Sequence, residues 1–247
     1  MNTWNTQWKN QWKKTLALGC AAFLLGGSAW GYAAPTVTAA SSAPHAANPQ
    51  DAPMPLPLTE EEVSAQQLAD AQYMALLWMR TSAEYRALCY QGYNAALMAI
   101  DRAQANPAAR SGKPLAIVLD CDETVTDNTR AMAAAAAAGN GRYDDLWWRA
   151  TVHEARSEAM PGAVEFLNEV ARRGVAIFYV SNRWSEVNYE PTIENLKALG
   201  FPSVDAEHVL LMEDRKMSDK QPRFDQIAKN YDVVVYMGDN AGDLPLG

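Results

Sequence analysis

The hydrophobic pattern of the chain centres on a short apolar run that ends in two carboxylates. Five apolar residues at 115–119 lead directly into Asp120 and Asp122. Such a run predicts a strand that is buried on both faces, as in a parallel sheet. Parallel sheets bind their ligands at the carboxyl ends of the strands, and buried carboxylates need a cation nearby. The alternative is a polar turn that only closes the strand.

Three further apolar runs predict the rest of this sheet. Strands are expected at 175–180, 209–212 and 233–237, and the stretches between them have the apolar spacing of helices. Strands that alternate with helices predict an α/β fold with a parallel sheet flanked by helices. The expected crossover helices cover 161–174, 186–199 and 220–230.

Helical spacing also predicts a helical region at 59–112, before the first strand. Thr59 precedes three glutamates, which is typical of a helix start. Thr81 and Glu84 have the spacing of a capping box, which favours two helices in this region rather than one. A second helical segment, at about 129–159, is expected to form a small cap inserted between the first two strands.

Two neighbouring tryptophans lie in this insertion. Trp147 and Trp148 are expected to pack inside the helical cap, because large aromatic side chains bury much apolar surface. The alternative is that they stack on a nucleobase of a ligand.

The first 33 residues have the layout of a secretory signal peptide. Three lysines precede an apolar stretch at 16–25 that is too short for a membrane span, and small residues lead to Ala33. Cleavage after Ala33 and export to the periplasm are expected. The alternatives are lipidation at Cys20, which would anchor the protein to the outer membrane, and an uncleaved anchor. Residues 34–58 are rich in Pro and Ala and predict a tether.

The net charge limits the classes of partner, and the cysteine content limits the possible disulfides. The net charge of −8 argues against a nucleic acid polymer as a ligand. Export implies an oxidising compartment, in which Cys89 and Cys121 would remain after cleavage. Two cysteines do not form a disulfide framework, so two buried free thiols are expected.

Polar residues follow the predicted strands at positions that meet at one edge of a parallel sheet. Oxygen ligands favour Mg²⁺, whereas the scarcity of histidine and the absence of a cysteine cluster disfavour zinc. The expected metal ligands among these side chains are Asp120, Asp239 and Asp243, and the expected substrate-binding residues are Ser181, Asn182 and Lys220.

Phosphoryl transfer suits this set of residues. Asp120 is expected to attack phosphorus and to form an aspartyl phosphate. Asp122 is expected to protonate the leaving alcohol and then to take a proton from the hydrolytic water. Ser181 and Lys220 would bind phosphate oxygens, with Lys220 supplying a positive charge.

The motifs resemble those of the haloacid dehalogenase (HAD) superfamily. Residues 120–124, Ser181, Lys220 and 238–243 match its four motifs in order. A finer resemblance is to the class C acid phosphatases, the lipoprotein-e type 5'-nucleotidases. It rests on residues 83–88, 120–128, 160–166, 181–183 and 199–201.

The resemblance implies a HAD-like Rossmannoid fold for 113–247. It also implies a Mg²⁺-dependent phosphomonoesterase that acts outside the cytoplasm on nucleoside monophosphates and other small phosphate esters. The backbone carbonyl of Asp122 would be a further metal ligand, and a homodimer is expected because related proteins often form one. The chain stops at Gly247 where members of the family continue, so two expectations stay open, a truncated chain and a fold that lacks the final segment. Two other functions stay open, a non-catalytic binding or surface protein and another HAD-type hydrolase.

Overall fold

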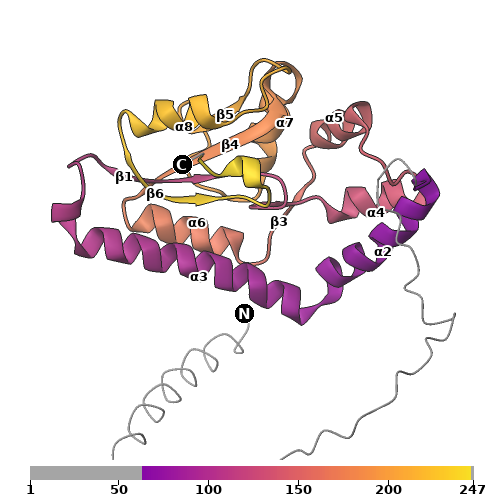
Figure 1. Cartoon of the computed structure of the whole chain (residues 1–247), viewed down its shortest axis with the longest axis horizontal. Coiled ribbons are helices and arrows are strands. Elements are labelled where there is room, and N and C mark those ends of the chain that lie inside the picture. The colour runs from indigo at the N-terminus through magenta and orange to yellow at the C-terminus, as the bar shows by residue number, and fades with distance from the viewer. Residues whose placement is uncertain (1–62, 246–247) are drawn as a thin grey trace, which may run out of the picture. The chain divides into compact units, whose positions relative to one another are not determined.

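The computed structural model describes residues 63–245 (Figure 1). The signal peptide, the tether and the helix start predicted at Thr59 lie outside the described residues. Within residues 63–245, no helix is long and apolar enough to cross a membrane.

A parallel sheet of four strands forms the centre of the described fold, which confirms the predicted α/β class. The strand order is β5-β4-β1-β6, so the first strand of the sequence lies inside the sheet. All neighbouring strands of this sheet pair in parallel. The strands are β1 (Leu115–Leu119), β4 (Ala176–Trp184), β5 (Val209–Met212) and β6 (Asp232–Met237).

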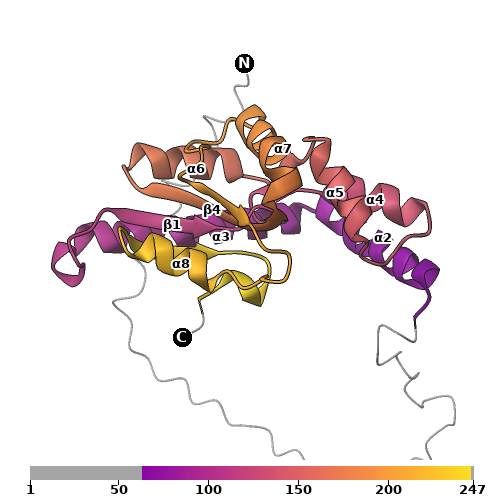
Figure 2. The same ribbon diagram turned by 90° about the horizontal axis from the view of Figure 1, so that it is seen from above.

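Helices cover both faces of this sheet. The side chains of Ile117 and Leu119 belong to the core shared with α3, α6 and α7, whereas those of Ala116 and Val118 pack toward α8. This division follows from the alternation of side chains along a strand. Figure 2 shows α6 and α8 on opposite sides of the sheet. The helices are α3 (Ala83–Ala105), α6 (Ala163–Arg172), α7 (Ser185–Ala198) and α8 (Gln221–Ala228).

The region before the sheet consists of two helices, as predicted, but the cap between them differs. Helix α2 (Ala65–Thr81) begins with a capping box formed by Ser64 and Gln67. Helix α3 is capped by Ser82, whose hydroxyl accepts a hydrogen bond from the backbone N–H of Tyr85. Ser82 has the extended backbone conformation that a capping residue needs, whereas Thr81 is still helical. The prediction that Thr81 caps this helix is therefore wrong.

Two helices, α4 (Thr129–Ala137) and α5 (Asp145–His153), occupy the segment where a helical insertion is predicted. Helix α4 is followed by Gly139 in a left-handed conformation, the usual end of an alanine-rich helix. A short antiparallel pair, β2 (Thr126–Asp127) with β3 (Glu158–Ala159), closes the base of this insertion. Two residues are too few to show an alternating pattern, so the sequence gives no sign of this pair.

Both cysteines of the described region are free thiols. Cys121 is completely buried in the turn that follows β1, as predicted. Cys89 on α3 is only partly buried, which differs from the prediction of two buried thiols.

Candidate active site

The turn after β1 places Asp120 and Asp122 at the edge of the sheet. The backbone N–H of Asp120 donates to the carbonyl of Met237 on β6, and the strand pairing ends there. The carbonyl of Cys121 then accepts hydrogen bonds from the N–H groups of Thr124, Val125 and Thr126. This compact turn directs the two aspartates around one site rather than to opposite faces of a strand. The carbonyl of Asp122 accepts no hydrogen bond from any residue in the described region.

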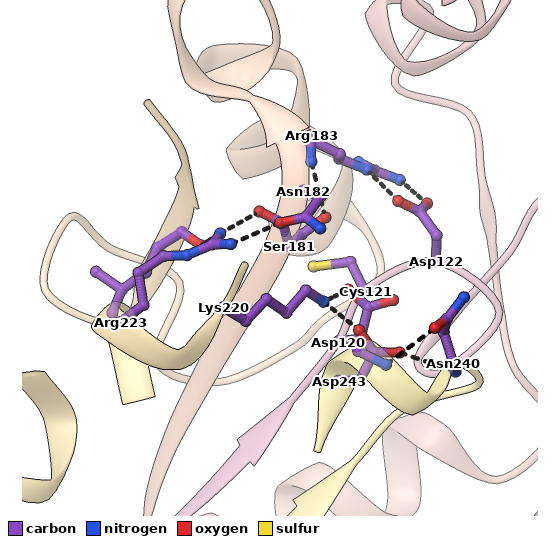
Figure 3. A network of polar contacts seen from close by, with 12 residues as sticks. Asp120, Cys121, Asp122, Ser181, Asn182, Arg183, Lys220, Arg223, Asn240 and Asp243 are labelled. Carbon is purple, nitrogen blue, oxygen red and sulfur yellow. Dashed lines mark hydrogen bonds and ion pairs between the residues drawn. The ribbon is translucent and has the colours of Figure 1, made fainter. Parts of the chain in front are cut away.

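A buried lysine links the first and fourth motifs. Lys220 immediately precedes α8, and its side chain is only 3% exposed. Its Nζ lies 2.6 Å from Asp120 Oδ1 and 2.6 Å from Asp243 Oδ1 (Figure 3). Removing a charge from water is costly unless opposite charges compensate it. Lys220 is therefore held by the two aspartates, and it supplies a fixed positive charge beside Asp120.

Asp120, Asp239 and Asp243 form a compact carboxylate cluster. One oxygen from each residue lies within 4.8 Å of the others. Burial raises the pKa of Asp120 to about 7, although Lys220 opposes this rise. Desolvation and the neighbouring Asp243 also raise the pKa of Asp239. Burial is the main cause of both raised pKa values, and the all-oxygen donor set suits a hard divalent cation such as Mg²⁺.

A glycine allows Asp243 to enter this cluster. Asp243 lies in a short 3₁₀ turn, η4 (Ala241–Asp243), and its Oδ2 accepts a hydrogen bond of 2.9 Å from the N–H of Asn240. A Cβ atom on Gly238 would overlap the side chain of Asp243. Gly238 therefore leaves the space that the Asp243 carboxylate fills.

The carboxylate of Asp122 lies outside that cluster and is paired with Arg183. Arg183 Nη2 donates to Asp122 Oδ1 at 2.6 Å, and Arg183 Nε donates to Oδ2 at 3.0 Å. Asn128 Nδ2 adds a third hydrogen bond, at 2.8 Å, to Oδ1. Burial alone would raise the pKa of Asp122, but the Arg183 guanidinium outweighs it and holds that pKa below its ordinary value. Arg183 and Asn128 lie within the motifs at 181–183 and 120–128, but neither was predicted to take part in the site.

The length of strand β4 explains why the contact of Arg183 with Asp122 was not predicted. This strand continues to Trp184, so Ser181–Arg183 lie within it and not after it, as the sequence predicted. Ser181 and Arg183 are both buried and stand two positions apart, which places them on the same face of a strand. A strand prediction that continued to Trp184 would have placed Arg183 on the same face as Ser181.

Asn182 lies at the rim of the site, where its side chain joins neighbouring segments. Its Nδ2 donates to the carbonyl of Ser218 at 2.7 Å, and its Oδ1 accepts a hydrogen bond from Arg223 Nη2. Arg223 also donates to the backbone carbonyl of Ser181 at 2.7 Å. Asn182 and Arg223 therefore hold β4 against the segment that carries Lys220.

All seven predicted site residues line one pocket of about 510 Å³. Two aromatic residues from the insertion, Tyr143 and Trp148, line the same pocket, whereas Trp147 does not. Both tryptophans are only half-buried, which differs from the prediction that they pack inside the cap. The pocket thus combines a carboxylate cluster, a buried lysine and an aromatic wall.

Comparisons with known proteins agree with this geometry. Residues 39–245 match the family described as HAD superfamily, subfamily IIIB (acid phosphatase). The structure is similar to that of the class C acid phosphatase from Bacillus anthracis, with 38% sequence identity and a TM-score of 0.65. The similarity covers 72% of this chain and 72% of that protein. A second crystal structure of that phosphatase, with tungstate bound, matches with the same identity, coverage and TM-score.

The family match spans most of the chain, and the pocket contains the residues of all four HAD motifs in one place. The resemblance inferred from the motifs is therefore confirmed. The chain belongs to the subfamily IIIB acid phosphatases of the HAD superfamily, and it is a phosphomonoesterase of the class C type.

Proposed function

We propose that the protein is a Mg²⁺-dependent phosphatase that hydrolyses small phosphate monoesters through an aspartyl phosphate on Asp120. The contact of Asp120 with Lys220, inside a cluster of three carboxylates, is the observation that supports this proposal most strongly. It pairs a nucleophile with a fixed positive charge that can reduce its repulsion from an incoming phosphate.

In the first step, a carboxylate oxygen of Asp120 attacks phosphorus. The bond between phosphorus and the ester oxygen breaks, and the bonding electrons remain on the leaving oxygen. Asp122 gives its proton to that oxygen, so the alcohol leaves in the neutral form. Because the pKa of Asp122 lies below its ordinary value, acidic pH favours the protonated form that this step needs. Lys220 and the hydroxyl of Ser181 bind the non-bridging phosphate oxygens during this transfer.

In the second step, the carboxylate of Asp122 takes a proton from a water molecule, and the water oxygen attacks phosphorus. The bond between phosphorus and the Asp120 oxygen breaks, which releases inorganic phosphate and restores the Asp120 carboxylate. Asp122 carries the proton again at the end of the cycle, so one residue serves as acid and then as base.

A divalent cation fits the carboxylate cluster of this site. Asp120, Asp239, Asp243 and the backbone carbonyl of Asp122 would hold it, and the close approach of the three carboxylates and the free carbonyl of Asp122 support this set. When bound, Mg²⁺ supplies positive charge that neutralises the phosphate oxygens. The side chain of Asp122, bound to Arg183, would remain available for proton transfer.

Nucleoside monophosphates are proposed as one substrate class. Tyr143 and Trp148 form an aromatic wall of the pocket that carries Asp120, and aromatic faces stack well on nucleobases. The tungstate bound to the Bacillus anthracis phosphatase is a tetrahedral oxyanion, which supports an oxyanion site in this family. Export of the protein through residues 1–33 and a homodimer also remain proposals.

The experiment that tests the proposed function is an assay of phosphate release from a nucleoside monophosphate by the full chain. Turnover should require Mg²⁺, should stop with a chelator, and should be lost in Asp120→Asn. Phosphate release by Asp120→Asn at the wild-type rate would contradict the assigned nucleophile. Equal release with chelator and with Mg²⁺ would contradict the metal dependence.

A further inference from the structure

We propose that Ser157 and Thr192 are positioning residues that orient Asp122 for proton transfer to the leaving group. They act through Asn128 and Arg183, the two residues that bind the Asp122 carboxylate most closely. This inference rests on the proposed function, in which Asp122 is the proton donor and acceptor. It assigns a positioning role to two polar residues that do not line the pocket themselves.

The first arm of this arrangement runs from α7 to Arg183. Thr192 is completely buried, and its Oγ1 accepts a hydrogen bond of 3.1 Å from Arg183 Nη1. The remaining nitrogens of the guanidinium group, Nε and Nη2, donate to the two oxygens of Asp122. Every nitrogen of this planar group is therefore held, so Thr192 fixes the plane in which Arg183 presents its paired donors.

The second arm runs from α7 to Asn128 through the segment after α5. Ser157 Oγ donates to Asn128 Oδ1 at 2.6 Å, and Asn128 Nδ2 donates to Asp122 Oδ1. The side chain of Asn195 fixes Ser157, because Oδ1 accepts from the Ser157 N–H at 3.2 Å and Nδ2 donates to the Ser157 carbonyl at 3.0 Å. Ser157 thereby determines which end of the Asn128 amide faces Asp122.

Both arms start on the same buried face of α7. Thr192 and Asn195 are three positions apart on this helix, which places them on neighbouring turns, and both are almost fully buried. Burying polar groups costs free energy unless they form hydrogen bonds, and these groups form them toward Asp122 from two directions. The two arms therefore connect the Asp122 carboxylate to α7 from two sides, and together with α7 they form a closed ring of contacts.

The ring leaves the two oxygens of Asp122 unequal. Oδ1 accepts hydrogen bonds from Arg183 Nη2 and Asn128 Nδ2, whereas Oδ2 accepts only from Arg183 Nε. A carboxylate oxygen has two lone pairs, so Oδ2 retains one that can carry a proton. The Asp122 side chain is 18% exposed and lines the pocket. Oδ2 is therefore the oxygen that gives its proton to the leaving oxygen and later takes one from water.

The test uses the dependence of the rate on the leaving group. A poor leaving group, such as the alkoxide of an alkyl phosphate, needs a proton donor, whereas p-nitrophenolate leaves without much assistance. Loss of orientation at Asp122 should therefore reduce kcat/KM for alkyl phosphates much more than for p-nitrophenyl phosphate. A general loss of folded protein would reduce both values by the same factor.

The variants are Ser157→Ala and Thr192→Val, measured in the full chain with saturating Mg²⁺. Each should lower kcat/KM for an alkyl phosphate by about 10-fold or more, a part of the effect of general acid catalysis. Each should change kcat/KM for p-nitrophenyl phosphate by less than about 3-fold, because little of that effect operates there. Thr192→Ser keeps the hydroxyl and should retain the wild-type ratio of the two substrates.

Equal losses on both substrates, or no loss on either, would overturn the positioning role. If Thr192→Val does not fold, Ser157→Ala decides the outcome, because Ser157 is only partly buried. The wild-type protein and Asp120→Asn, run in the same assay, separate this inference from the proposed function. Absence of Mg²⁺-dependent turnover in the wild type would overturn both proposals, whereas an unchanged substrate ratio in active variants would overturn only the positioning role.

Discussion

The ammonium group of Lys220 lies 2.6 Å from Asp120 Oδ1, and both side chains are almost fully buried. Lys220 belongs to the start of α8 and Asp120 to the turn after β1, so the pair joins segments that are 100 positions apart. The same lysine contacts Asp243 at the end of the chain's fourth motif. Three separate segments therefore meet at one buried positive charge.

Replacement of Lys220 should destabilise the protein as well as inactivate it. Lys220→Met leaves the buried carboxylates of Asp120 and Asp243 without their cation, so the free energy of unfolding should fall by about 3–5 kcal/mol in chelator. Urea denaturation measures this change. Lys229→Met removes an exposed lysine next to the same helix and serves as the control. An unfolding curve for Lys220→Met that matches the control would contradict the structural role of this ion pair.

A divalent cation should stabilise the folded protein through the carboxylate cluster. Mg²⁺ neutralises three carboxylates that lie within 4.8 Å, so it should raise the thermal unfolding midpoint. Asp239→Asn should reduce this shift, because it removes one charged ligand. Asp70→Asn, a change on the exposed face of α2, should leave the shift intact. A shift of equal size in the wild type and Asp239→Asn would argue against a cation at this cluster.

The space beside Gly238 should be required for activity. In Gly238→Ala the new Cβ would overlap Asp243, so the carboxylate must move out of the cluster. A displacement of this kind should lower kcat by about 10²-fold. Gly242→Ala is the matched control in the same loop, because its Cβ would meet nothing closer than 3.6 Å. If both variants retain wild-type kcat, the position of Asp243 does not limit the reaction.

The break between α2 and α3 should depend on Ser82. Ser82→Ala removes the hydroxyl that accepts from the Tyr85 N–H, which should cost about 1 kcal/mol of unfolding free energy. The hydroxyl of Thr81 donates to the carbonyl of Leu77 inside α2 and caps neither helix, so Thr81→Ala should cost less. Chemical denaturation of both variants checks this order. A larger loss in Thr81→Ala would instead assign the capping role to Thr81.

Much of the sheet was predictable from local patterns. The strands at 115–119 and 209–212 have the predicted bounds, because each is a continuous apolar run between polar segments. Strand β4 differs, since it continues through three polar residues that are stabilised by tertiary contacts rather than by their own pattern. The capping residue of α3 depends on which of two adjacent hydroxyl residues leaves the helical conformation, and spacing alone does not determine that choice.

The identity of the pocket residues was also largely predictable, but their partners were not. Asp120, Lys220 and Asp243 meet because parallel strands bring their carboxyl ends to one edge. The pairing of Asp122 with Arg183 and Asn128 depends on the extension of β4 and on the turn at 120–126, both of which arise from packing. Tyr143 reaches the pocket from a loop of the insertion, for which the sequence contains no periodic signal.

The most direct test of the central claim is to trap the covalent intermediate. The full chain is mixed with Mg²⁺ and a ³²P-labelled phosphate monoester, quenched with acid within milliseconds, and assayed for radioactivity bound to protein. The account predicts label on the wild-type protein that alkali releases as phosphate, and no label on Asp120→Asn. Catalytic turnover without protein-bound label at any quench time, or label on Asp120→Asn, would contradict Asp120 as the nucleophile.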